Sequence, residues 1–280
     1  MCAQRFTVLG VDFTSAPRPG KPITVAVGHL QSDAFVLEAI ECAEDFAAFE
    51  RVLRRPGPWI AGIDAPFGLP REAVRDLGWP LQWDALVRYC AAIGKTAFRA
   101  ALDRYRESRP MGNRYAHRAT DRPAGSHSPL KLVNPPVGLM FLATAPRLLT
   151  AGVSIPGLHA GDTERIAVEA YPGYAARKMT NASYKSDDRV KQTPARLEAR
   201  KSMVDILMQD GGPFCFRLTT DRTIQTKLTD DASGDHLDAV LAALQAAWSL
   251  RRADDYFGMP PVIDPLEGWI ATVPPEDPSA

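Results

Sequence analysis

The sequence contains few of the patterns that mark secreted or membrane proteins. Its four cysteines, Cys2, Cys42, Cys90 and Cys215, are scattered and form no C-x-x-C pair. The start of the chain shows no signal-peptide pattern, so we expect reduced thiols and a cytoplasmic protein. No uninterrupted apolar run approaches the roughly 20 residues that a membrane-spanning helix needs, which argues against a membrane partner.

The chain also lacks net charge, internal repeats and low-complexity segments. Lysine plus arginine and aspartate plus glutamate both number 33 among the 280 residues. Attraction to a polyanion must therefore come from local clustering of basic residues, and composition neither supports nor excludes nucleic acid. With 45% hydrophobic residues the chain can bury a sizeable core. We expect a single domain over 1–280 with a helical, basic insertion at 71–150.

The pattern of apolar runs and turn residues predicts an α/β fold that begins with three antiparallel strands, a helix and a fourth strand. Because a helix connects the three strands to the fourth, the fourth strand should run parallel to the first. Asp12 and Asp64, at the ends of the first and fourth strands, should then emerge at the same edge. The expected strands are 6–13, 23–29, 34–40, 59–64 and 165–169. The expected helices are 43–53, 84–106, 137–149, 194–209 and 234–251, with a short one that follows a Pro172-Gly173 turn and ends at about 179.

Acidic residues end several of these apolar segments. Asp12 and Asp64 each close a strand with a Gly-x-Asp ending, and Glu169 closes a later strand. Asp235 and Asp238 lie three residues apart on one face of an alanine-rich helix that we expect to be nearly buried. A carboxylate at the end of a buried strand is costly to desolvate, so these residues suggest a shared task.

The shared task that we favour is metal binding. Carboxylates without accompanying cysteine or paired histidine suit Mg²⁺ or Mn²⁺. Two such ions can hydrolyse a phosphodiester, one activating water and the other stabilising the leaving oxygen. Two alternatives stay open: Asp235 stabilises only the helix N-terminus, or the acids form structural ion pairs with Arg177, Lys185 or Arg200 in a non-catalytic binding module.

Arginines interleaved with tyrosines in the insertion indicate a surface for nucleic acid. Arg109, Arg114 and Arg118 lie in this stretch and are candidates for phosphate contact. Lys185 and Arg200, from a second basic stretch, are candidates for phosphate binding or for pairing with the acids. The competing interpretation of the insertion is a solvated helix face followed by a flexible loop. His117 and His127 lie in this loop too far apart to indicate a metal site.

Several motifs follow one another along the chain, namely Gly10-Val-Asp12, Asp64-Ala-Pro-Phe-Gly-Leu-Pro70, Glu169-Ala-Tyr-Pro172, Lys185, Lys191-Gln-Thr-Pro194, Arg200, Asp235-His-Leu-Asp238-Ala and Glu267-Gly-Trp-Ile270. In this order they resemble the domain of unknown function numbered 429, a family regarded as a predicted nuclease of ribonuclease-H-like fold. The resemblance implies a five-stranded mixed sheet with strands one to three antiparallel. It also implies that Asp12 is the central metal ligand and that Asp238 is similar to the late aspartate of Holliday-junction resolvases.

The residues and the resemblance together predict a divalent-metal-dependent nuclease. The expected catalytic residues are Asp12, Asp64, Glu169 and Asp238. The expected ligands of Mg²⁺ or Mn²⁺ are Asp12, Asp64, Asp235 and Asp238. A nucleotide-binding phosphotransferase of related fold is a further alternative, but the stretch 12–17 after the first strand lacks the glycine that close approach to a phosphate would need.

Overall fold

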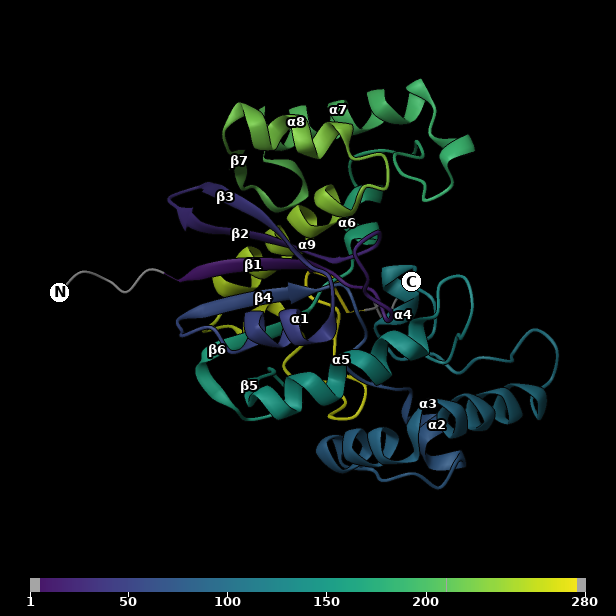
Figure 1. Ribbon diagram of the computed structural model, residues 1–280. Coiled ribbons are helices and arrows are strands. Elements are labelled where there is room, and N and C mark those ends of the chain that lie inside the picture. The colour runs from purple at the N-terminus through teal and green to yellow at the C-terminus, as the bar shows by residue number, and fades with distance from the viewer. Residues whose placement is uncertain (1–5, 210, 276–280) are drawn as a thin grey trace.

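The computed structural model describes residues 6–209 and 211–275, so Cys2 lies outside the described residues. A mixed sheet of seven strands, in the order β5-β6-β4-β1-β2-β3-β7, forms the centre of this part of the chain (Figure 1). The strands are β1 Thr7–Asp12, β2 Ile23–Gln31, β3 Ala34–Ala43, β4 Trp59–Ile63, β5 Val153–Ser154, β6 Asp162–Glu169 and β7 Arg217–Thr219.

The pairing of the first four strands confirms the predicted topology. β1 is antiparallel to β2, and β2 is antiparallel to β3. β4 runs parallel to β1 with Val11 opposite Ile63, and the backbone N–H of Asp64 donates to the carbonyl oxygen of Val11 at 2.9 Å. Asp12 and Asp64 therefore leave the sheet side by side.

The sheet has two strands more than the five expected. β5 and β7 are two and three residues long and pair at opposite edges of the sheet, β5 with β6 and β7 with β3. Segments this short show no measurable period in the sequence, and their pairing depends on neighbours distant in the chain.

Each expected helix has a counterpart among the described helices, and α2, α4 and α8 are additions. α6 begins at Pro172, where a turn was expected. α1 begins at Phe46 rather than at position 43, because the carboxylate of Asp45 accepts a hydrogen bond from the N–H of Ala48 at 2.7 Å. Gly94 interrupts α3 with a φ of 73°. The α-helices are α1 Phe46–Leu53, α2 Arg71–Asp76, α3 Trp83–Glu107, α4 Asp121–Ala124, α5 Val137–Ala151, α6 Pro172–Arg177, α7 Pro194–Gln209, α8 Arg222–Asp230 and α9 Asp235–Leu250.

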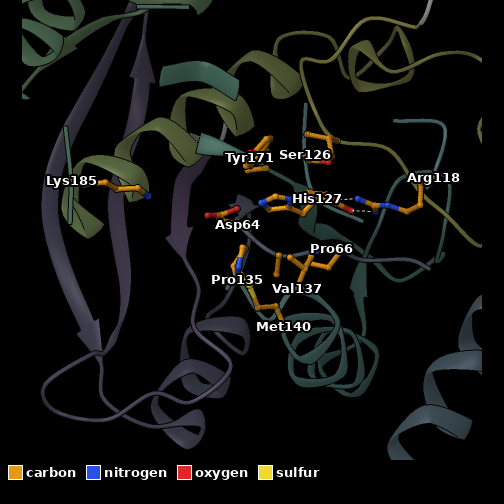
Figure 2. Close-up of a pocket in the computed structure, with 14 residues that line it drawn as sticks. Asp64, Pro66, Arg118, Ser126, His127, Pro135, Val137, Met140, Tyr171 and Lys185 are labelled. Carbon is orange, nitrogen blue, oxygen red and sulfur yellow. Dashed lines mark hydrogen bonds and ion pairs between the residues drawn. The ribbon is translucent and has the colours of Figure 1, made fainter. Parts of the chain in front are cut away.

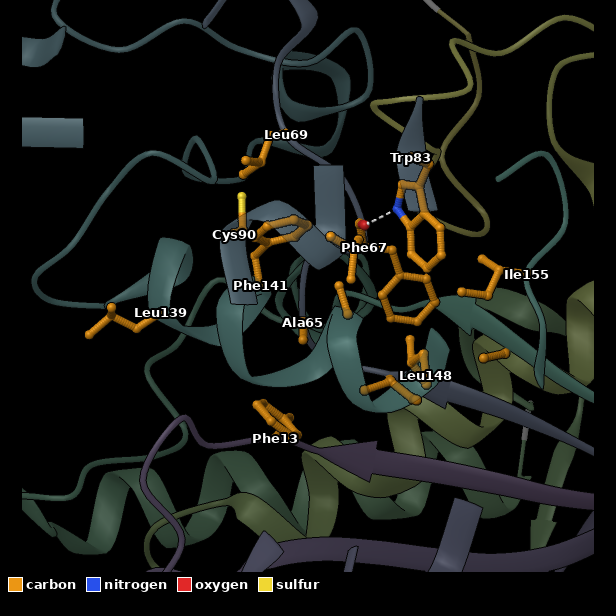
Figure 3. Close-up of a cluster of buried hydrophobic side chains, with 14 of the residues drawn as sticks. Phe13, Ala65, Phe67, Leu69, Trp83, Cys90, Leu139, Phe141, Leu148 and Ile155 are labelled. Atoms are coloured by element: carbon orange, nitrogen blue, oxygen red, sulfur yellow. Dashed lines mark hydrogen bonds between the residues drawn. The ribbon is translucent and has the colours of Figure 1, made fainter. Parts of the chain in front are cut away.

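Two hydrophobic clusters cover the two faces of the sheet. Leu9 and Val11 of β1 point into a cluster that includes residues of α1, α3 and α5. Within it, Trp83 Nε1 donates to the carbonyl oxygen of Phe67 at 2.7 Å (Figure 3). Val8 points to the opposite face, into a cluster that includes residues of α6, α7, α8 and α9. Because side chains alternate along a strand, Gly10 and Asp12 lie on the same face as Val8, toward α9.

The alanine-rich helix α9 packs directly on the glycines of β1 and β4. A Cβ added at Gly10 would lie 2.0 Å from the carbonyl oxygen of Ala239, and one added at Gly62 would lie 2.2 Å from that of Ala242. Glycine on the strands and alanine on the helix are thus required by the closeness of the two backbones. The Gly-x-Asp endings therefore place an acid beside the first turn of α9, which carries Asp238.

The segment after α9 packs Trp269 onto the body, as expected. Its indole N–H donates to the carbonyl oxygen of Val273 at 2.8 Å, and the N–H of Ala271 donates to the carbonyl oxygen of Glu169 at 2.8 Å. This extends the edge of the sheet near Glu169. Among the described residues, no helix combines the length and apolar character required to cross a bilayer.

Candidate active site at the strand ends

Asp12, Asp64 and Asp238 converge where β1, β4 and the first turn of α9 meet. Asp12 is the last residue of β1, and Asp64 directly follows β4. Both residues are half-buried, whereas Asp238 is fully buried. Within residues 6–209 and 211–275, no side chain or backbone group donates a hydrogen bond to the carboxylate of Asp12 or Asp64. Two of the three acids are therefore partly desolvated without a direct partner.

The two acids of α9 each contact a lysine. Asp238 accepts a hydrogen bond from the hydroxyl of Tyr184 at 2.6 Å and another from Lys185 Nζ. Asp235 accepts from Lys21 Nζ, which lies 3.0 Å from both of its carboxylate oxygens. The acids of α9 therefore have ammonium partners, whereas the strand-end acids Asp12 and Asp64 have no direct cationic partner among the described residues.

Burial and mutual repulsion both disfavour the charged forms of the strand-end acids. Burial raises the pKa of Asp12 well above its usual range, and the carboxylates of Asp238 and Asp235 raise it further. Burial also raises the pKa of Asp64 to about 7, with Lys185 opposing the shift and Asp238 adding to it. Each acid therefore resists ionisation in the absence of more positive charge, and a cation bound between them would relieve this repulsion.

Lys185 supplies positive charge to this cluster. Burial acts to lower its pKa, but the carboxylates of Asp238 and Asp12 outweigh that effect and raise the pKa well above its usual range. Its side chain is still 42% exposed. Lys185 is therefore a protonated ammonium group that faces both the acids and solvent.

The acids match the ligands that Mg²⁺ or Mn²⁺ prefer in kind but not in their present arrangement. In the conformation of the described residues, no three of the histidine, cysteine, aspartate and glutamate side chains are gathered closely enough to hold a metal ion. Asp235 and Asp238 instead direct oxygens at Lys21 and Lys185. The chemistry of the donors nevertheless fits Mg²⁺ or Mn²⁺, because the strand-end acids are hard oxygen donors without partners. Binding through Asp238 would require Lys185 to move.

Glu169 lines the same pocket as Asp64, but its carboxylate is held in a buried ion triad with Arg118 and Asp121. Its two carboxylate oxygens each accept a hydrogen bond of 2.7 Å from Arg118, and one accepts another from the N–H of Phe67 at 2.9 Å. Arg118 also contacts Asp121 at 2.9 Å. Ala167 lies two residues before Glu169 on β6, so both residues face the same side of the sheet. Ala167 belongs to the cluster on the face opposite α9. Glu169 therefore points away from Asp12, and its described contacts are those of a structural ion pair.

Two of the predicted phosphate-binding arginines are also occupied within the protein. Arg200 is buried and donates to the carbonyl oxygens of Thr229 at 2.7 Å and Tyr184 at 2.6 Å. Arg109 forms an ion pair with Glu72. Arg200 thus supports the backbone next to Lys185, which is a positioning role that its place in the sequence did not reveal.

The other predicted basic contacts differ in their surroundings. Arg118 is buried in the ion triad, whereas Arg114 is exposed. Lys185 contacts Asp238, and Arg118 contacts Glu169. The predicted basic residues are thus dispersed, with Lys185 at the strand ends and Arg114 on the exposed loop.

A pocket of ≈ 230 Å³ lies beside Asp64 (Figure 2). His127 and Met140 line it but were not among the site residues predicted from the sequence. The motif around Glu169 included Tyr171, but no sequence-local signal linked His127 or Met140 to the acids. The lining residues are Asp64, Ala65, Pro66, Arg118, Ser126, His127, Pro135, Val137, Met140, Glu169, Ala170, Tyr171, Lys185 and Ile270.

The family assignment agrees with the resemblance seen in the sequence. A sequence model described as "Protein of unknown function (DUF429)" matches residues 10–260. The chain belongs to the DUF429 family. The DUF429 match includes the strand-end acids, the acids of α9 and every residue that lines the pocket except Ile270. No curated protein matches the chain. No solved structure matches it either.

Proposed function

We propose that this protein is a divalent-metal-dependent phosphodiesterase that acts on nucleic acid. Its Mg²⁺ or Mn²⁺ would be held by Asp12, Asp64 and Asp238, with Asp235 close by. The observation that carries the proposal is the convergence of the three acids from β1, β4 and α9. Two of these carboxylates lack direct partners among the described residues, and their pKa values are raised by burial and by neighbouring acids.

The strand arrangement supports a ribonuclease-H-like fold for the proposal. β1, β2 and β3 are antiparallel, and β4 and β6 continue the sheet parallel to β1. An acid ends the first strand, a second acid follows the neighbouring strand, and a third lies on the long helix α9. This is the placement that the family resemblance implied for the ligands. β5 and β7 extend the sheet without separating β1 from β4.

The side chains around the acids have separate tasks in this proposal. A bound ion would supply activation of water and stabilisation of the leaving oxygen. Asp12 and Asp64 would hold the ion, and the hydroxyl of Tyr184 would orient Asp238. Lys185 faces the acids and solvent, so its ammonium group is placed to contact a phosphate of the substrate.

The decisive experiment compares wild type with Asp12→Asn. Millimolar Mn²⁺ should raise the melting temperature of wild type, relative to EDTA, and leave that of Asp12→Asn nearly unchanged. Wild type should cleave at least one of single-stranded, hybrid or branched nucleic acids, and Asp12→Asn should not. Asp205→Asn, on the surface of α7, is the matched control and should behave as wild type. Equal cleavage by wild type and Asp12→Asn would refute the proposed centre.

A second candidate function is a non-catalytic binding module whose acids are neutralised by lysines. The contacts of Lys185 with Asp238 and of Lys21 with Asp235 favour it. The other two cations considered for this role, Arg177 and Arg200, donate instead to backbone carbonyl oxygens. The module predicts no stabilisation of wild type by Mn²⁺, so the same melting experiment separates the two functions.

A further inference from the structure

The pocket beside Asp64 has two chemically different sides. Pro66, Pro135, Val137 and Met140 form an apolar side, and His127 lies across from them (Figure 2). Tyr171 and Asp64 lie on the same side as His127 in this view. A planar heterocycle has two faces that can contact protein side chains. An apolar wall on one side and an aromatic ring on the other therefore suit such a ligand.

We propose that this pocket binds the base of one unpaired nucleotide. The inference rests on the proposed function for its substrate class and names which part of the nucleic acid enters the protein. The volume, ≈ 230 Å³, is small for a drug-sized ligand, which usually occupies ≈ 300–1,000 Å³, and suits one small group. The pocket thus accommodates a single base rather than a stacked pair.

Charge at the pocket favours a base that carries a phosphate over a neutral apolar ligand. Asp64 and Lys185 both line the pocket, so a group bound inside it lies directly beside the proposed metal ligands. Lys185 can contact a phosphate, and an ion held by Asp12 and Asp64 would favour the same group. The base and the phosphate of one nucleotide would therefore be bound at adjoining places.

His127 has the properties of a side chain that contacts the base. The residue as a whole is exposed although its side chain is partly desolvated, and Nε2 lies 3.2 Å from Lys131 Nζ. Burial, and then the charge of Lys131, lower the pKa of His127 below its usual value. A neutral imidazole both donates and accepts hydrogen bonds, and its ring can stack on a base.

A base can enter this pocket only when it is not paired in a duplex. The protein should therefore prefer single-stranded nucleic acid, or a nucleotide displaced from a duplex, over continuous double helix. This preference follows from the pocket and not from the acids, which would serve any phosphodiester. The pocket thus adds a specificity that the proposed metal centre does not supply.

Calorimetric titration in EDTA tests the assignment without metal or catalysis. The probes are the four common nucleoside 5′-monophosphates and ribose 5-phosphate, which carries the phosphate but no base. At least one nucleotide should bind about tenfold more tightly than ribose 5-phosphate. Val137→Trp, which fills the apolar side, should reduce nucleotide binding about tenfold. Val262→Trp makes the same substitution at a site that is 88% exposed and should leave binding unchanged.

His127→Ala provides a second test because its exposed side chain can be removed with little risk to folding. It should weaken nucleotide binding and leave the weak binding of ribose 5-phosphate unchanged. Equal binding of nucleotides and ribose 5-phosphate by wild type would overturn the assignment, whether or not nucleic acid is cleaved. Base-dependent binding that Val137→Trp or His127→Ala removes would support the pocket even if Asp12-dependent cleavage were absent, in which case only hydrolysis would be rejected.

Discussion

Gly10 and Ala239 set the distance between the central strand and the helix that carries two of the acids. A Cβ on Gly10 would lie 2.0 Å from the carbonyl oxygen of Ala239, well inside any allowed contact. Asp238 precedes Ala239, and Asp12 follows Gly10 by two residues on the same face of β1. The close packing of the two backbones is therefore also what brings the two carboxylates together.

Gly10→Ala should destabilise the protein by about 3 kcal/mol, because the added methyl group must push α9 away from β1. Urea unfolding followed by circular dichroism measures the loss. Gly20→Ala is the control, since an added Cβ there meets nothing within 4 Å. It should change the free energy of unfolding by less than about 0.5 kcal/mol. Equal stability of the two variants would contradict the close packing of α9.

Arg118→Met should destabilise the protein by about 3–5 kcal/mol, because it leaves two buried carboxylates without their cation. These are Glu169 and Asp121, which are 4% and 0% exposed. The measurement is the urea midpoint at neutral pH. Arg114→Met replaces an exposed arginine of the same segment and should shift the free energy of unfolding by less than about 0.5 kcal/mol. A small effect of Arg118→Met would show that the triad is solvated.

The meeting of Asp12 and Asp64 could be predicted because it depends on local rules. Each residue ends an apolar strand, and a crossover helix makes the two strands parallel. The length and alanine content of 234–251 likewise predicted a buried helix, and α9 is almost the same segment. These features follow from the spacing of apolar residues and from the order in which strands and helices are connected.

The partner of Glu169 could not be predicted in the same way. Arg118 is 51 residues away in an irregular segment, and its burial depends on how that segment folds over β6. The sequence therefore indicated a phosphate contact for an arginine that is occupied by carboxylates. The pocket could not be predicted for the same reason. His127 comes from a loop and Met140 from a helix, and only tertiary packing places them near Asp64.

Asp231→Asn should lower the free energy of unfolding by about 1–2 kcal/mol at neutral pH, because it weakens hydrogen bonds at the start of α9. Burial alone would raise the pKa of Asp231, but hydrogen bonds from the backbone N–H of His236 and from Ser233 hold it below the usual 3.8. A carboxyl group with a lowered folded-state pKa stabilises the protein fully above its unfolded-state pKa. This contribution is lost as pH falls through the folded-state pKa.

The stability difference between wild type and Asp231→Asn should therefore be constant near neutral pH and shrink below about pH 4. Urea titrations across this range measure it. Asp254→Asn, at an exposed position, should show little difference from wild type at any of these pH values. A difference that persists unchanged in strong acid would show that the charge of Asp231 is not what stabilises the helix start.

Lys185→Met should lower the melting temperature in EDTA and enlarge the rise caused by Mn²⁺. The substitution removes the ammonium group that contacts Asp238, so repulsion among Asp238, Asp12 and Asp64 is less well offset. It also frees an oxygen of Asp238 for the ion. The Mn²⁺-dependent rise should exceed that of wild type by at least about 2 °C. Lys201→Met, on the exposed face of α7, should match wild type. If Mn²⁺ raised the melting temperature of Lys185→Met no more than that of wild type, lysine and metal would not compete for Asp238.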